Sequence, residues 1–163
     1  MLVRHPVVVS LGICTLAAAA EGILSGKRPM EVLATLRLPR FTPPRWAWIV
    51  IGVFYYVICF TILTRLLEMD GFNRLQYSAT VLMIVLLGLN GLFNYQLFRS
   101  RNVQAAFVIF IPYDLVALAL QICLFCLDNT AGYVFVSYLA YLVFATVWGY
   151  ELRRLNLTNE PHS

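Results

Sequence analysis

The chain has 163 residues, of which 61% are hydrophobic and only 12% charged, and its formal net charge is +4. A soluble globular domain usually has about 25% charged residues and exposes much of its surface to water, so this composition excludes one. The basic residues stand singly or in pairs at the ends of apolar runs, which argues against a nucleic-acid-binding face. We therefore expect an all-α integral membrane protein that contacts the lipid bilayer and no nucleic acid.

Apolar runs separated by short polar segments predict five membrane spans. A helix needs roughly 20 mostly apolar residues to cross the hydrocarbon core of a bilayer. The runs place the spans at approximately residues 6–24, 45–67, 75–98, 103–127 and 131–155. Little length remains outside them, so we expect a single membrane domain over residues 1–163, a bundle of five transmembrane helices.

The longest polar segment, residues 25–44, connects the first two spans. Loops of this length are uncommon between packed helices and often serve as lids or binding loops. We expect two short helical stretches inside it, one of them near residues 30–36. At its end, Thr42 can cap the second span, because threonine is a common N-cap and proline, here Pro43 and Pro44, is favoured at the first helical position.

Polar side chains inside a span are costly in lipid, and they mark either function or hydrogen bonding between helices. The predicted spans contain Asn90, Asn94, Gln96, Asp114 and Gln121. Asp114 carries the highest cost, so we expect it to face the bundle interior or a wet cavity. Two interpretations are open: Asp114 anchors a ligand or proton path, or it hydrogen-bonds a neighbouring helix. Glu21, near the end of the first span, is expected at the membrane interface.

The residues predict neither a metal centre nor a cofactor. Cys123 and Cys126 form a C-x-x-C pattern within an apolar run, without further soft ligands nearby. No hydrolase motif, phosphate loop or catalytic dyad occurs in the sequence. The chemistry of the sequence alone therefore argues against a conventional enzyme.

Lysine and arginine are distributed unevenly between the two sides of the predicted bundle. Of the 12 such residues in the chain, nine lie in the long loop, in the connection between the third and fourth spans, and near the C-terminus: Lys27, Arg28, Arg37, Arg40, Arg45, Arg99, Arg101, Arg153 and Arg154. The positive-inside rule places this side, with the long loop and the C-terminus, in the cytoplasm.

Three local patterns carry a resemblance to a known family. They are Pro43-Pro44-Arg45-Trp46 at the second span, Leu89-Asn90 with Phe93 and Leu97-Phe98 in the third, and Phe135 to Tyr141 with Tyr150-Glu151 in the fifth. With the five short-looped spans, they resemble the TspO/MBR family, the translocator proteins also called peripheral benzodiazepine receptors or tryptophan-rich sensory proteins. The chain resembles a divergent member, with departures from the family pattern at Gly91, Phe93, Asn94, Ser137, Tyr141 and Gly149.

The resemblance implies a five-helix bundle, often a homodimer, with a pocket beneath the first loop, in a bacterial membrane or the mitochondrial outer membrane. Carried over by position, the pocket involves Trp46, Asn90, Phe93, Tyr138, Tyr141 and Phe144. Val147, Tyr150 and Arg153 match a loose sterol-binding pattern. Two interpretations are open for Arg37, Arg40 and Arg45: they pair with porphyrin carboxylates as part of a lid, or they face lipid phosphates.

The leading hypothesis is a TspO-like receptor or carrier that binds a porphyrin, another tetrapyrrole or a sterol-like ligand in an aromatic pocket. The alternatives are a light-dependent porphyrin-degrading enzyme, a proton-coupled small-molecule transporter that uses Asp114, and a structural partner protein without a small-molecule ligand. We expect a receptor or carrier rather than an enzyme.

Overall fold

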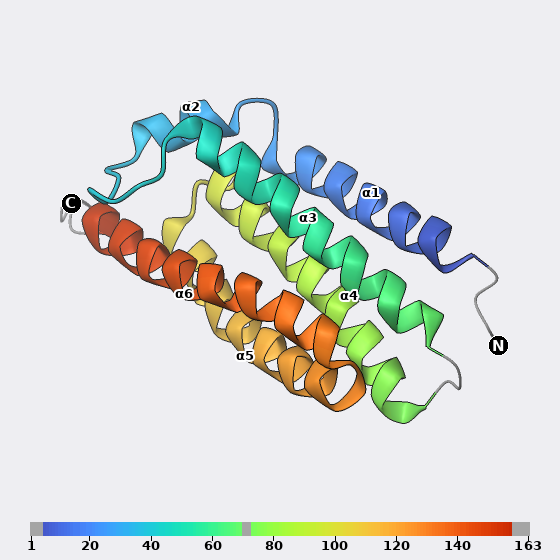
Figure 1. Ribbon diagram of the computed structural model, residues 1–163. Coiled ribbons are helices and arrows are strands. Elements are labelled where there is room, and N and C mark those ends of the chain that lie inside the picture. The colour runs from blue at the N-terminus through green and yellow to red at the C-terminus, as the bar shows by residue number, and fades with distance from the viewer. Residues whose placement is uncertain (1–4, 70–72, 158–163) are drawn as a thin grey trace.

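The computed structural model describes residues 5–69 and 73–157, which are helical apart from short connections (Figure 1). In chain order the elements are α1 (Pro6–Ser25), α2 (Pro29–Thr35), α3 (Arg45–Glu68), α4 (Arg74–Asn94), the π-helical turn η1 (Tyr95–Arg99), α5 (Val103–Leu127) and α6 (Asn129–Leu157). Within these described residues five helices are long and apolar enough to cross a membrane. The predicted all-α fold with five membrane helices is therefore confirmed. Of the two short helical stretches expected in the long loop, the structure has one, α2.

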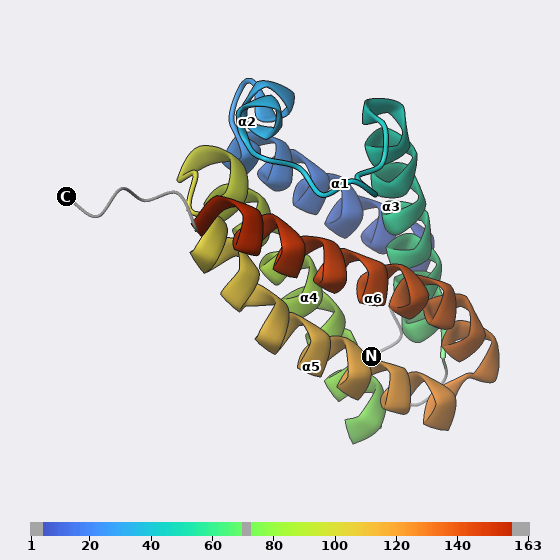
Figure 2. The ribbon, with the colours of Figure 1, turned by 90° about the vertical axis from the view of Figure 1, so that its left-hand side faces the viewer.

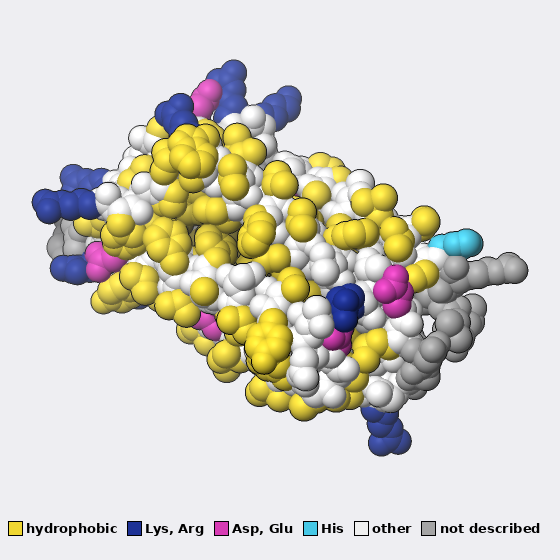
Figure 3. Space-filling model, in the orientation of Figure 1, with side chains coloured by type: hydrophobic (Ala, Val, Ile, Leu, Met, Phe, Trp, Pro, Cys, Tyr) yellow, Lys and Arg dark blue, Asp and Glu magenta, His cyan; other side chains and the backbone are white. Residues whose placement is uncertain are grey.

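Apolar side chains cover the outside of the bundle. Leu16 on α1, Ile23 on α1 and Val143 on α6 are among the exposed large hydrophobic residues. Figure 3 shows hydrophobic side chains across the middle of one face, with Lys and Arg mainly toward its ends. This distribution suits a lipid environment, where helices satisfy their backbone groups internally and present apolar side chains outward.

The five long helices close into a ring. α1 packs against α3 and α4, α4 packs against α5, α5 packs against α6, and α6 returns to α3. The very short connection at Asp128 makes α5 and α6 antiparallel neighbours, as predicted. Figure 2, seen from the end that carries α2, shows the segment between α2 and α3 crossing from one to the other.

The two halves of this ring are packed differently. Large, fully buried side chains gather in the half remote from α2: Ile62, Leu63, Leu66, Met83, Leu86, Leu120, Leu124 and Phe135. At that end the guanidinium of Arg65 on α3 donates two hydrogen bonds to the carboxylate of Asp128, which lowers the pKa of Asp128 below its ordinary value. The half beneath α2 is lined by larger aromatic and polar side chains and encloses a cavity.

The prediction that Thr42 caps the second span is wrong. The N-cap of α3 is Pro44, in extended conformation and without a side-chain capping bond. A residue that precedes proline is driven toward extended backbone, so the run Thr42-Pro43-Pro44 delays the helix until Arg45. The Thr42 hydroxyl instead donates to the Pro39 carbonyl at 2.7 Å and accepts from the indole Nε1 of Trp148 at 3.0 Å.

A close approach between α5 and α6 depends on Gly149. A Cβ atom built at this position would lie 2.5 Å from Cε2 of Phe110, whose side chain is buried. Such a distance is far below van der Waals contact, so the ring of Phe110 occupies the space of a side chain at residue 149. Phe110 in turn lies 5.1 Å from Phe93 between ring centroids, which links this contact to the cavity wall.

We predict that Gly149→Ala destabilises the protein in detergent by about 1–3 kcal/mol, because the added methyl group overpacks a buried contact. Gly88→Ala is the matched control, since no atom lies within 4 Å of a Cβ built there. Thermal unfolding of both variants checks the prediction. Equal melting temperatures for the two variants would show that Phe110 does not need the glycine.

Candidate ligand pocket

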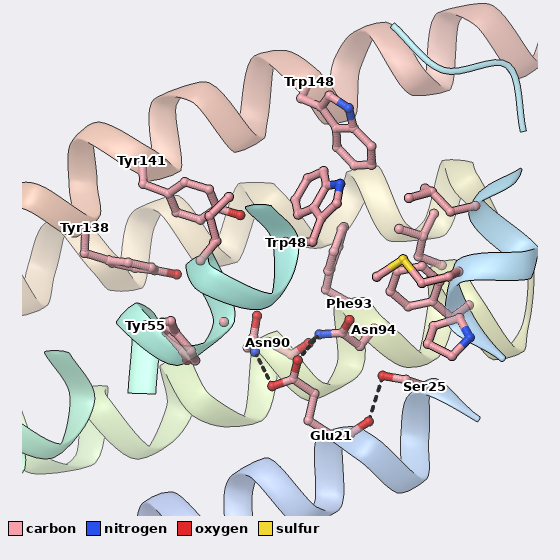
Figure 4. Close-up of a pocket in the computed structure, with 17 residues that line it drawn as sticks. Glu21, Ser25, Trp48, Tyr55, Asn90, Phe93, Asn94, Tyr138, Tyr141 and Trp148 are labelled. Carbon is pink, nitrogen blue, oxygen red and sulfur yellow. Dashed lines mark hydrogen bonds between the residues drawn. The ribbon is translucent and has the colours of Figure 1, made fainter. Parts of the chain in front are cut away.

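A cavity of about 250 Å³ lies in the half of the ring beneath α2. Its walls come from α1, α2, α3, α4, η1 and α6, so it is formed only when the whole ring is assembled. Figure 4 shows the side chains that surround it. The volume is near the lower end of the range for small-molecule pockets, roughly 300–1,000 Å³, and the lining is mostly apolar and aromatic as in such sites.

The floor of the cavity is a polar network centred on Glu21. Its Oε2 accepts hydrogen bonds from the hydroxyl of Tyr56 at 2.6 Å and from Nδ2 of Asn90 at 2.8 Å, and its Oε1 accepts from Nδ2 of Asn94 at 3.0 Å. Figure 4 shows Glu21 reaching from α1 toward the two asparagines of α4. The carboxylate therefore joins α1, α3 and α4 by charge-assisted hydrogen bonds, which are stronger than neutral ones.

The walls of the cavity are aromatic. Trp48 on α3 and Trp148 on α6 meet edge to face, with ring centroids 5.1 Å apart. Tyr55 and Tyr138 lie 5.3 Å apart across the seam between the same two helices. The buried indole Nε1 of Trp48 has no hydrogen-bond partner among the described residues. The walls thus offer flat apolar faces and a free donor.

The chain matches the TspO/MBR family over residues 10–155, nearly its whole length. The chain belongs to the TspO/MBR family. Among curated proteins, a sequence comparison finds no match. Membership makes it a multi-pass membrane protein and supports, in general terms, a receptor-type role toward sterol or porphyrin ligands.

Four of the six pocket residues carried over from the family pattern line the cavity of this TspO/MBR protein: Asn90, Phe93, Tyr138 and Tyr141. Trp46 does not: its side chain is 67% exposed on the outside of α3. Residues two positions apart point to nearly opposite sides of a helix, so Trp48 takes the inward position. Phe144 does not line the cavity. The centroid of its ring lies 6.3 Å from that of Tyr141, which does.

Asp114 lies outside the main pocket, whereas we expected it to face the bundle interior or a wet cavity. It lines a groove on the outer side of α5 and α6, beside exposed Leu118 and Val143. Its carboxylate accepts a hydrogen bond from the hydroxyl of Thr146 on α6, at 3.3 Å to Oδ1 and 3.2 Å to Oδ2. Asp114 was interpreted either as an anchor for a ligand or proton path or as a hydrogen-bond partner of a neighbouring helix. The structure shows the hydrogen bond to the neighbouring helix.

The residues of the sterol pattern also lie away from the cavity of this TspO/MBR protein. Val147 and Tyr150 are exposed on α6, and Val147 shares the outer groove with Asp114. The guanidinium carbon of Arg153 lies 5.3 Å from the ring centroid of Phe107, a cation–π distance. These residues therefore form an outer surface of α5 and α6 rather than part of the pocket.

The three arginines proposed for the lid, Arg37, Arg40 and Arg45, are exposed and do not line the cavity. The loop that carries Arg37 and Arg40 is fixed to the C-terminal end of α6. Asn156 Nδ2 donates to the Arg37 carbonyl at 3.0 Å, and the Arg37 amide donates to Asn156 Oδ1 at 3.1 Å. Leu33 of α2 is buried in a cluster with Leu97 and Trp148, so α2 covers the end of the pocket.

Sequence reasoning missed Glu21, which we expected at the membrane interface. A signal for the position of Glu21 was the spacing of Asn90 and Asn94. Four residues apart, the two amides lie on one face of α4, where they need a hydrogen-bond partner inside the bundle. In the part of the chain that the structure describes, no group of histidine, cysteine, aspartate or glutamate residues could hold a metal ion.

We predict that Thr42→Val loosens the loop over the pocket, because the buried indole N–H of Trp148 loses its acceptor at a cost of about 1–3 kcal/mol. Hydrogen exchange should become faster at the backbone amides of residues 36–44 and stay unchanged in α5. Thr61→Val is the control, since its hydroxyl bonds only to its own helix at the Val57 carbonyl and is exposed. Unchanged exchange in the loop would mean that the hydrogen bond does not hold it.

Proposed function

We propose that this protein is a TspO-type membrane receptor or carrier that holds a flat lipophilic ligand, such as a porphyrin, another tetrapyrrole or a sterol-like molecule. The observation that carries the proposal is the aromatic cavity with a single polar floor inside a membrane bundle. Small-molecule sites combine apolar walls with a few placed polar groups that set orientation. Here the walls provide stacking surfaces and the floor provides orientation.

The unpaired indole of Trp48 supports a ligand in this position. A buried donor without a partner costs free energy, typically about 1–3 kcal/mol. Trp48 lines the cavity, so a small shift of its ring that exposes the nitrogen would let an acceptor atom on a ligand recover that cost. Trp148, by contrast, already donates to Thr42 and is fixed as a wall.

Access from the lipid is supported by a second cavity, of about 220 Å³, in the seam between α3 and α6. It shares Tyr55, Tyr138 and Tyr141 with the main pocket and extends to Phe54 and Val50, which are exposed on the outer surface. A lipophilic ligand dissolved in the bilayer can reach the pocket along this seam. A ring as large as a porphyrin exceeds the main cavity and would extend into the seam.

The pocket lies at the end of the bundle that carries most of the basic residues, including Arg28, Arg37 and Arg99. Under the positive-inside rule this end faces the cytoplasm. We therefore propose a receptor whose loop and α2 are cytoplasmic, with the ligand held in the cytoplasmic half of the membrane.

Light-dependent degradation of a bound porphyrin is a second candidate, and the contact between Trp48 and Trp148 inside the pocket favours it. The two functions differ in the fate of the ligand. Illumination of the porphyrin complex followed by extraction separates them: a receptor or carrier releases the porphyrin with its absorption spectrum intact, whereas an enzyme yields a changed spectrum.

We predict saturable quenching of tryptophan fluorescence by protoporphyrin, weakened about tenfold in Tyr141→Ala, because the variant loses an aromatic wall. Tyr133→Ala is the matched control: Tyr133 lies on the same helix, is 71% exposed and does not line the cavity. Titration of the detergent-solubilised proteins measures the affinities.

Trp46→Phe should keep most of the quenching, since Trp48 and Trp148 remain in the pocket, whereas Trp48→Phe should lose a large part of it. Absence of saturable quenching in the unaltered protein, or equal losses in the Tyr141 and Tyr133 variants, would contradict the proposed function.

A further inference from the structure

The charge inside the pocket is negative. Among the described residues that line the main cavity, Glu21 is the only aspartate, glutamate, lysine, arginine or histidine. The arginines and the lysine of the same end are outside it: Arg28 is exposed and bonds Glu31, and Arg99 is exposed and donates to the Ile23 carbonyl. The cavity therefore offers a ligand an acid within reach and no base.

The carboxylate of Glu21 has capacity for a further donor. A carboxylate provides about four lone-pair positions. Three hydrogen bonds reach it, two at Oε2 and one at Oε1 from Asn94. Oε1 can therefore accept another hydrogen bond from a group that enters the cavity.

The two asparagines extend the set of acceptors. Both turn their amide nitrogen to Glu21, which leaves their carbonyl oxygens directed away from it, as Figure 4 shows for Asn90 and Asn94. The floor of the pocket thus presents acceptor atoms. An anionic group at this place would face acceptors and a like charge, whereas a group with several N–H donors would be satisfied.

The walls above the floor suit a cation as well as a flat ring. Trp48, Trp148 and Tyr141 place aromatic rings around the space next to Glu21. The face of an aromatic ring attracts a cation, and tryptophan does so most strongly. Rings around a carboxylate are therefore complementary to a protonated amine attached to an apolar body.

We propose that the pocket selects a flat lipophilic ligand that carries a protonated amine, with the amine donating to Glu21 and the rings packed against Trp48 and Trp148. The inference rests on the proposed function, because it assumes that this cavity is the ligand site. A cavity of about 250 Å³ suits a body of two or three fused rings.

The basic residues at the end of the bundle do not reverse this preference. They are exposed to water, where salt screens a charge over about 8 Å. Glu21 and its partners Asn90 and Asn94 are half-buried, where charge interactions are screened less. An acidic porphyrin could place its carboxylates at the rim and leave Glu21 unused, and the test is designed to detect that result.

The test uses three probes with the same three-ring body and different charge: (anthracen-9-yl)methylamine, anthracen-9-ylmethanol and 9-anthraceneacetic acid. Tryptophan quenching gives each affinity in detergent, and titrations without protein correct for partition into micelles. We expect the amine to bind about tenfold more tightly than the alcohol, and the acid to bind most weakly, because a hydrogen bond between charged partners is stronger than a neutral one.

Glu21→Gln should bring the amine to the affinity that the alcohol has for the same variant. Glu31→Gln is the matched control, since it removes the same charge from an exposed position on α2. Tyr56→Phe keeps the charge of Glu21 and loses one donor, so it should keep the preference for the amine. Melting temperatures show whether each variant is folded, and the comparison of probes on the unaltered protein stands without any variant.

The outcomes separate this inference from the proposed function. Equal affinities for the three probes, or tightest binding of the acid, would overturn the inference and leave a receptor for flat lipophiles standing. A preference for the amine that survives Glu21→Gln would overturn the assignment to Glu21. Failure of all three probes and of protoporphyrin to bind would overturn both.

Discussion

The structure depends on how a carboxylate is accommodated inside a membrane bundle. A charged or polar group buried without partners costs several kcal/mol, and in lipid no water is available to supply them. Glu21 meets this constraint with donors from two other helices, Tyr56 on α3 and the asparagines Asn90 and Asn94 on α4. The same contacts that join α1 to the ring also place an acid at the floor of the cavity. These hydrogen bonds therefore serve both the fold and the candidate site.

The division of the ring into a dense half and a hollow half follows from side-chain size and position. Aliphatic side chains such as Leu66, Leu86 and Leu120 fill the half remote from α2, where Arg65 and Asp128 connect α3 to the turn between α5 and α6. Toward α2 the facing residues are aromatic. Trp48 and Trp148 meet edge to face with ring centroids 5.1 Å apart, and both line the cavity that lies beside this pair. The dense half holds the helices in place, and the hollow half is where we propose that a ligand binds.

The sequence predicted the features that depend on local properties, such as where helices begin and end. It missed the features that depend on which face of each helix points inward. Hydropathy and prolines determine the five helices and the short helix in the loop. α3 and α5, however, are apolar on nearly every side, so their sequences do not show which face is inward. The family resemblance assigned Trp46 to the pocket in place of Trp48. Asp114 was expected in the bundle interior or a wet cavity, and Glu21 was expected at the interface. Only the order of helices in the ring decides these positions, and that order arises from tertiary contacts.

The most direct test of the account is an experimental structure of the protein with (anthracen-9-yl)methylamine bound. We predict that the ring system packs against Trp48 and Trp148, with the amine nitrogen at hydrogen-bond distance, about 2.7–2.9 Å, from Oε1 of Glu21. A probe bound in the outer groove beside Asp114, or bound in the cavity with its amine turned away from Glu21, would contradict it.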